Sequence, residues 1–88
     1  MIRKRIRFCG QVQGVGFRWR ASRAAESYRC TGWCKNEWDG TVLMEIQGEE
    51  SAIDRVIESI EAGRYVEITK MDVRTMPVDP DKKSFYAE

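Results

Sequence analysis

The chain has 88 residues, 42% hydrophobic and 33% charged, which is the composition of a small globular domain and excludes a disordered or fibrous protein. Fifteen Lys and Arg residues against fourteen Asp and Glu leave a formal net charge of +1, so no global field attracts nucleic acid or an anionic membrane. Histidine is absent, which excludes the commonest general base and the commonest metal ligand near neutral pH. We therefore expect one domain over residues 1–88, with no metal site.

The N-terminal residues and the cysteines bear on the cellular compartment. Charged residues from Arg3 to Arg7 stand where a signal peptide has its apolar segment, and no stretch approaches the apolar length of a membrane span. Cys9, Cys30 and Cys34 are odd in number and lack the spacing of a zinc site. We expect a cytoplasmic protein with free thiols and no membrane partner.

The chain begins with a predicted strand, glycine-rich loop and helix. Apolar and basic side chains alternate from Ile2 to Phe8, which is typical of a strand with one wet face. The side chains expected on that solvated face are Arg3, Arg5 and Arg7. Three glycines fall between Gly10 and Gly16, and apolar residues then recur at helical spacing from Phe17 to Cys30.

The middle of the chain predicts a hairpin. Residues 31–36 and 41–47 are short strand candidates, and the second alternates apolar and polar side chains. Between them lies Asp39-Gly40, a strong hairpin signal. The two strands are therefore expected to pair with each other.

The remaining segments predict a helix and two strands. Ser51 and Asp54 resemble a capping box at the start of an amphipathic helix, and Gly63 is placed to end it as a C-cap. A strand with a bulge or bend inside it follows from Val66 to Val73. The segment from Ser84 to Tyr86 is expected to form a short edge strand.

The order of these elements predicts the fold. Strand, helix, two strands, helix and strand (βαββαβ) match the split βαβ arrangement. We therefore expect an α+β, ferredoxin-like sandwich, in which two helices cover one face of an antiparallel sheet.

The loop from Gly10 to Arg18 is a candidate anion site. Its glycines let backbone N–H groups turn inward at a helix N-terminus, and the guanidinium of Arg18 adds a fixed positive charge. A plain glycine-rich turn is the alternative that these residues leave open. The Walker and dinucleotide motifs do not fit, and Cys9 stands too far from Arg18 for the loop of a cysteine-based phosphatase.

Asn36 is the second candidate site residue. An Asn at the end of a strand is most often a turn former, yet its amide can also orient a water molecule without titrating. Trp19, Trp33 and Trp38 stand near element ends, where we expect them to pack rather than to line a pocket.

These two segments together resemble the signatures of the acylphosphatase family. Residues Gly10 to Arg18 match the first signature, Gly-x-Val-Gln-Gly-Val-x-Phe-Arg, at every fixed position. The second signature sets glycines, an aromatic residue, a basic residue, an asparagine and a valine at fixed spacing. Its positions are matched by Gly32, Trp33, Lys35, Asn36, Gly40, Val42 and Gly48.

The resemblance spans the whole chain and implies both an activity and a site. It implies hydrolysis of the carboxyl–phosphate bond of acyl phosphates, without metal or cofactor, to a carboxylate and inorganic phosphate. Arg18 and Asn36 match the catalytic positions: Arg18 would hold the phosphoryl oxygens in the transition state, and Asn36 would orient the attacking water. The phosphate-binding positions implied are Gln13, Gly14, Val15, Gly16, Phe17 and Arg18.

Two other functions stay open. One is a non-catalytic module that binds phosphate, acyl phosphate or carbamoyl phosphate, because related domains occur inside larger carbamoyl-transferring proteins. The other is single-stranded RNA binding by the sheet, which the balanced charge and the lack of an aromatic-rich RNA-binding motif disfavour. We expect a small-molecule acyl phosphate as partner, inorganic phosphate as product or inhibitor, no nucleic acid partner, and a monomer.

Overall fold

β1 (Ile2–Gln11) is an inner strand of the sheet, and both of its edges are paired. In the computed structural model, which describes all 88 residues, its neighbours are β3 (Val42–Gly48) and β4 (Glu67–Met76), both antiparallel to it. β2 (Thr31–Asn36) pairs antiparallel with β3, and β5 (Phe85–Ala87) pairs with β2. The sheet order is therefore β4-β1-β3-β2-β5.

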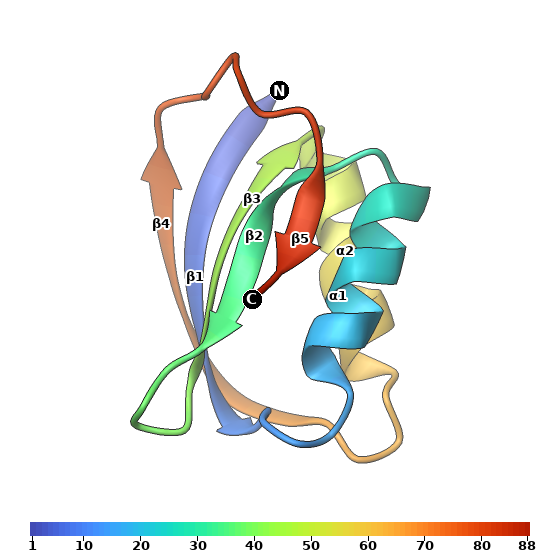
Figure 1. Ribbon diagram of the computed structural model, residues 1–88, viewed down its shortest axis with the longest axis vertical. Coiled ribbons are helices and arrows are strands. Elements are labelled where there is room, and N and C mark those ends of the chain that lie inside the picture. Colours follow the sequence, from blue (N-terminus) through green and yellow to red (C-terminus); the bar gives the residue numbers. More distant parts are fainter.

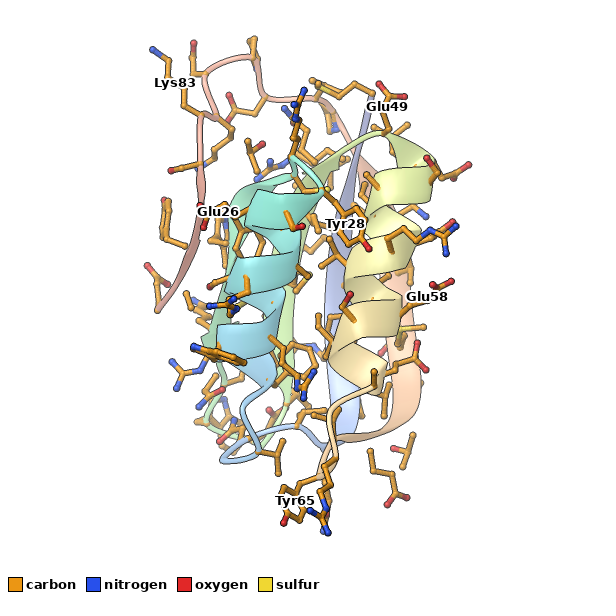
Figure 2. All side chains as sticks on the ribbon, turned by 90° about the vertical axis from the view of Figure 1, so that its right-hand side faces the viewer. Glu26, Tyr28, Glu49, Glu58, Tyr65 and Lys83 are labelled. Carbon is orange, nitrogen blue, oxygen red and sulfur yellow. The ribbon has the colours of Figure 1, made fainter.

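The helices α1 (Phe17–Ser27) and α2 (Glu50–Glu61) both lie on one face of the sheet, and the other face is open (Figure 1). They run side by side in front of the strands (Figure 2). Each helix turns an apolar stripe toward the sheet, which is why it packs there. This arrangement confirms the predicted α+β, ferredoxin-like sandwich. Neither helix has the length and hydropathy needed to span a membrane.

The core fills the space between the helices and the sheet. β1 contributes Ile6 and Phe8, and β3 contributes Val42, Met44 and Ile46, all of them completely buried. Each such side chain stabilises the fold by about 1.5–3 kcal/mol relative to its exposure in water. The helices add Ala21, Ala24, Ala25, Ile53, Val56 and Ile60. Burial of this kind fixes the positions of β1 and α1, between which the glycine-rich loop runs.

β5 confirms the edge strand predicted near the end of the chain. The prediction of an entirely antiparallel sheet is wrong, because β5 runs parallel to β2. The connection before it is tied to β3 by Gln47, whose side chain exchanges two hydrogen bonds with the backbone of Asp79, at 2.7 and 2.8 Å. The amide of Gly32 then donates to the carbonyl of Ser84 at 3.0 Å. Alternation of side chains carries no information about strand direction, so the sequence did not reveal this pairing.

The predicted helix ends need correction. α1 ends at Ser27, before the predicted limit, because the chain turns at Arg29, whose φ is +59°. α2 begins at Glu50 with no side-chain cap, so the capping box predicted at Ser51 and Asp54 is wrong. A carboxylate in the first turn favours the helix N-terminus instead.

Gly63 has a different function from the one predicted. α2 already ends at Glu61, and Gly63 lies outside the left-handed region. A Cβ atom at this position would lie 2.8 Å from both Arg20 Nε and Val66 Cγ2. Gly63 therefore lies close to Arg20, in the first turn of α1, and to Val66, and does not form a C-cap.

The bend predicted in the last long strand is confirmed as a bulge. Cys9 pairs with Lys70 and Gly10 with Ile68, which leaves Thr69 as an extra residue on β4. Gly10 has a φ of +120°, and a Cβ there would lie 2.1 Å from the backbone of β4. The irregularity falls just before the glycine-rich loop and so sets where β1 leaves the sheet.

Arg3 lies on the face that was predicted to be solvated, but it is not exposed there. Its side chain is buried, and its Nη2 donates to Glu45 Oε1 at 2.6 Å. Arg5 is exposed and approaches the same carboxylate only at 3.9 Å, and Arg7 is partly exposed. The alternation thus predicted the face correctly, but it did not show that the neighbouring strands bury one of the three arginines.

Removing the Glu45 carboxylate is expected to destabilise the fold strongly. Glu45→Ala leaves the guanidinium of Arg3 buried without its partner, which should lower the free energy of unfolding by about 3 kcal/mol. Urea unfolding measures this loss. Glu58→Ala, which breaks the exposed pair of Arg55 and Glu58, is the control and should cost less than about 0.5 kcal/mol. Similar losses in both variants would contradict the assignment of a structural ion pair to Arg3.

Candidate active site

The glycine-rich loop is held in the core at both ends. Val12, near the start of the loop, and Phe17, where α1 begins, are both almost completely buried. The ring of Phe17 packs edge-on against Phe8 of β1, with ring centroids 4.9 Å apart. Val15 packs against the core from the middle of the loop. These contacts leave the backbone between them at the protein surface with little freedom to move.

Gly14 and Gly16 give the loop its curvature. Their φ angles are +72° and +83°, in the left-handed region that favours glycine. Gly16 is also the N-cap of α1 and has no side chain to cap the helix. The backbone N–H groups from Gln13 to Gly16 donate no hydrogen bond within the protein. Free donors at a helix N-terminus form a site for an anion.

Arg18 lies in the first turn of α1, next to these free donors, and is partly buried. Its Nη1 donates a hydrogen bond to the main-chain oxygen of Glu88, just after β5. The amide of Glu88 donates in turn to the carbonyl of Cys34 at 2.8 Å. The terminal segment therefore holds the guanidinium beside β2, a contact for which the sequence offered no signal.

Asn36 ends β2 and is exposed, and its side chain makes no hydrogen bond within the protein. It shares strand parity with Cys34, which is buried under the helices. Its side chain therefore points to the face of the sheet that carries α1 and the loop. The loop and the β2–β3 hairpin lie at the same end of the sheet (Figure 1). The fold thus brings the two candidate catalytic residues to one end of the molecule.

Gln13 joins the loop to the hairpin that follows Asn36. Its Nε2 donates to the carbonyl of Glu37 at 2.7 Å and to the carbonyl of Thr41 at 2.9 Å. The side chain is therefore committed to positioning, and only its backbone N–H remains for an anion. Gln13 is among the predicted phosphate-binding positions, but nothing in the sequence distinguished it from Gln11 as the residue that makes this side-chain contact.

Cys34 lies near Arg18, but its thiol is buried and therefore resists ionisation. Burial raises the pKa of the Cys34 thiol to about 12, although the positive charge of Arg18 opposes the shift. Burial also raises the pKa of Cys30 to about 11. All three cysteines are free, as predicted, and Cys9 is partly exposed. No group of three or more carboxylates or thiols is placed to hold a metal ion.

The prediction that the three tryptophans pack against the rest of the protein is wrong. Trp38 is 98% exposed at the tip of the hairpin, and Trp19 is 63% exposed with the guanidinium of Arg23 over its ring. Trp33 is partly exposed on the open face of the sheet, with Lys35 beside it. Their places near element ends brought them to the surface rather than into the core.

The chain is similar to known proteins over nearly its whole length. Residues 4–87 match the sequence profile of the acylphosphatase family. The chain belongs to the acylphosphatase family. An acylphosphatase of Geobacillus thermodenitrificans is 46% identical over 77 residues, which cover 86% of this chain and 82% of that protein.

Two solved structures have the same fold as this family member. The match with the crystal structure of the acylphosphatase of Bacillus subtilis covers 100% of this chain and 99% of that one, with a TM-score of 0.89 and 30% identity. Full-length HypF in its phosphate- and nucleotide-bound form matches 99% of this chain with a TM-score of 0.82 and 27% identity. The match covers only 12% of HypF. The fold therefore occurs both as a small protein and within a much larger one.

Loss of the Gln13 amide is expected to loosen the hairpin. Gln13→Ala removes two hydrogen bonds to backbone carbonyls and should lower the free energy of unfolding by about 2 kcal/mol. Hydrogen exchange should accelerate at the amides of Glu37 and Gly40. Gln11→Ala, at an exposed position of β1, is the matched control. Unchanged exchange in the hairpin would show that other contacts hold it.

The buried thiols should also show a pH dependence. Because the pKa values of Cys30 and Cys34 rise from 9.0 to about 11 and about 12, the unfolded chain ionises first. Their contribution to stability is therefore fully present below pH 9.0 and is lost as the pH rises through the folded values. At pH 8, a thiol reagent should label Cys9 far faster than the other two. Equal labelling of all three in the folded protein would contradict their burial.

Proposed function

We propose that the protein hydrolyses acyl phosphates to a carboxylate and inorganic phosphate at the end of the sheet where Arg18 and Asn36 lie. The observation that carries the proposal is the set of free N–H groups from Gln13 to Gly16, followed directly by the guanidinium of Arg18. These donors suit three phosphoryl oxygens, whose negative charge they can share. The family match supports the assignment of the substrate.

Arg18 and the loop amides would bind the phosphoryl group. The guanidinium contributes a permanent charge and two parallel donors, and the amides from Gln13 to Arg18 surround the remaining oxygens. Phosphoryl transfer redistributes charge over these oxygens, so donors already in place lower the barrier without reorganising. The buried anchors Val12 and Phe17 hold the amides in that arrangement.

Asn36 would orient the attacking water. Its amide neither gains nor loses a proton near neutral pH, so it acts by position alone. The water oxygen bonds to phosphorus as the bond from phosphorus to the carboxylate oxygen breaks, and the carboxylate leaves with the bonding electrons. The proton released by the water passes to the phosphate product or to solvent. Because a carboxylate is a good leaving group, the reaction needs no strong base.

A binding module without turnover is the second candidate. HypF, whose structure is phosphate-bound, contains the same fold in 12% of its length. Such a module would need the free amides and Arg18, but it would not need Asn36. The two functions can therefore be separated by one variant.

Hydrolysis of benzoyl phosphate in the presence of a chelator is the test. We expect the parent protein to turn over, and both Arg18→Gln and Asn36→Ala to lose about 100-fold or more in kcat/KM. Asn36→Ala should still bind inorganic phosphate, whereas Arg18→Gln should not. Calorimetric titration with phosphate separates the two effects.

Arg23→Gln is the matched control, because it removes the same charge from an exposed position on the same helix. It should keep the parent activity. Full turnover in Asn36→Ala would contradict the orienting role of the amide. No turnover in the parent, with phosphate binding intact, would identify a binding module instead.

A further inference from the structure

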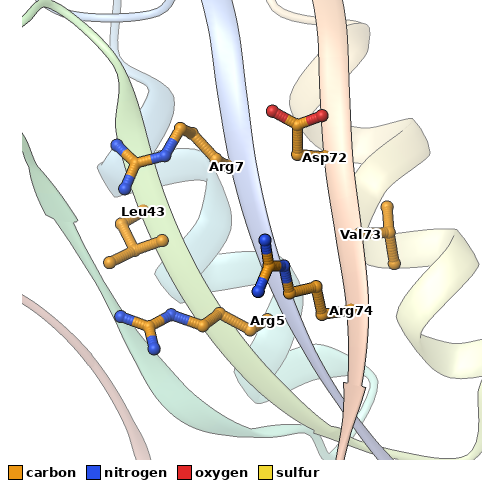
Figure 3. Close-up of a pocket in the computed structure, with 6 residues that line it drawn as sticks. All are labelled: Arg5, Arg7, Leu43, Asp72, Val73 and Arg74. Atoms are coloured by element: carbon orange, nitrogen blue, oxygen red, sulfur yellow. The ribbon is translucent and has the colours of Figure 1, made fainter.

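The open face of the sheet has a basic hollow that the proposed active site does not use. It has a volume of about 510 Å³ and lies on the face opposite the helices. β1 contributes Arg5 and Arg7, β3 contributes Leu43, and β4 contributes Arg74. Figure 3 shows the guanidinium groups of Arg5 and Arg7 on either side of Leu43. The guanidinium of Arg74 is directed toward them from β4.

Of the three arginines that line the hollow, Arg74 is the one without a partner inside the protein. Arg74 makes no side-chain hydrogen bond or ion pair. Arg5 reaches Glu45 only at 3.9 Å, and that carboxylate already accepts a hydrogen bond from Arg3 at 2.6 Å. The lining carries three guanidinium groups and one carboxylate, so it has an excess of positive charge, which favours anions.

The one carboxylate of the hollow, Asp72, has its own partner, Lys70, at 3.7 Å. Arg7 is restrained by a hydrogen bond to Thr41 Oγ1 at 2.9 Å, and its two ion pairs with the hairpin carboxylates are long, at 3.8 and 3.9 Å. Its guanidinium is therefore held in place beside the hollow by the hairpin.

The fold itself does not require this arrangement. Arg5 and Arg74 are directly opposite each other on neighbouring antiparallel strands, and like charges in that relation destabilise a sheet. Neither side chain is buried, so neither adds to the core. An anion bound between the strands would offset the repulsion and use the planar donors of each guanidinium.

We propose that this hollow binds a small molecule that carries two or more linked phosphate groups. A single phosphate at an exposed position is screened by water and salt, whereas a phosphate chain can engage Arg5, Arg7 and Arg74 together. Leu43 provides a small apolar floor between the charged groups. The phosphate chain is the recognised element, whether it is inorganic or belongs to a nucleotide.

Titration of isotope-labelled protein with sodium tripolyphosphate, followed by NMR, tests the proposal. The amide signals of Arg5, Leu43 and Arg74 should shift in a saturable way, both in the parent and in Arg18→Gln. The double variant Arg5→Gln/Arg74→Gln should weaken this binding about tenfold or more. Lys83→Gln removes one charge from an exposed position outside the hollow and is the control.

A parallel titration with ATP distinguishes the two sources of a phosphate chain. Equal affinity for ATP and tripolyphosphate would show that the site recognises the phosphate groups alone. Tighter binding of ATP would show that it also recognises the nucleoside. The proposal would be overturned by shifts confined to residues 13–18, by parent affinity in the double variant, or by equal affinity for orthophosphate and tripolyphosphate. Tighter binding of a single-stranded RNA than of either ligand would also overturn it, in favour of a nucleic acid surface. Hydrolysis of benzoyl phosphate should be unchanged in the double variant, so failure here leaves the proposed function intact.

Discussion

The edge-on contact between Phe8 and Phe17 is the constraint on which the candidate site depends. It fixes the first turn of α1 against β1, and both rings are buried in the core. The six residues from Gln11 to Gly16 must therefore span a set distance and reverse direction within it. Left-handed glycines allow this reversal, and the backbone N–H groups are left without partners as a result. Core packing and the anion site are thus two outcomes of one contact.

Gln13 connects the glycine-rich loop to the β2–β3 hairpin, which follows Asn36. The loop and the β2–β3 hairpin come from different parts of the chain, and each is a surface connection that would otherwise move independently. One amide joins them through two carbonyls of the hairpin turn. Asn36, at the end of β2, and the loop that leads to Arg18 are therefore held at the same end of the sheet. This suits a protein without histidine, because its proposed chemistry depends on position more than on proton transfer.

Much of the fold and part of the site could be predicted from the sequence, for identifiable reasons. Alternation from Ile2 to Phe8 and the helical stripes reflect burial, which also decides the structure, so the element order and the helical face were correct. The bulge near Thr69 was visible as a change of parity. The parallel pairing of β5, the burial of Arg3 and the contact of Arg18 with Glu88 were not visible. Each depends on residues brought together from distant parts of the chain, and local patterns do not record such contacts.

The pairing of β1 has a consequence for how the protein folds. Its partners lie far along the chain: Ile2 is opposite Gly48, and Arg3 is opposite Met76. β1 cannot complete its hydrogen bonds until nearly the whole chain has collapsed around it, and closing such long loops costs entropy before any contact offsets it. Folding of this small domain should accordingly be slow for its size. The glycine-rich loop, although it is local in sequence, acquires its final shape only when that long-range pairing is made.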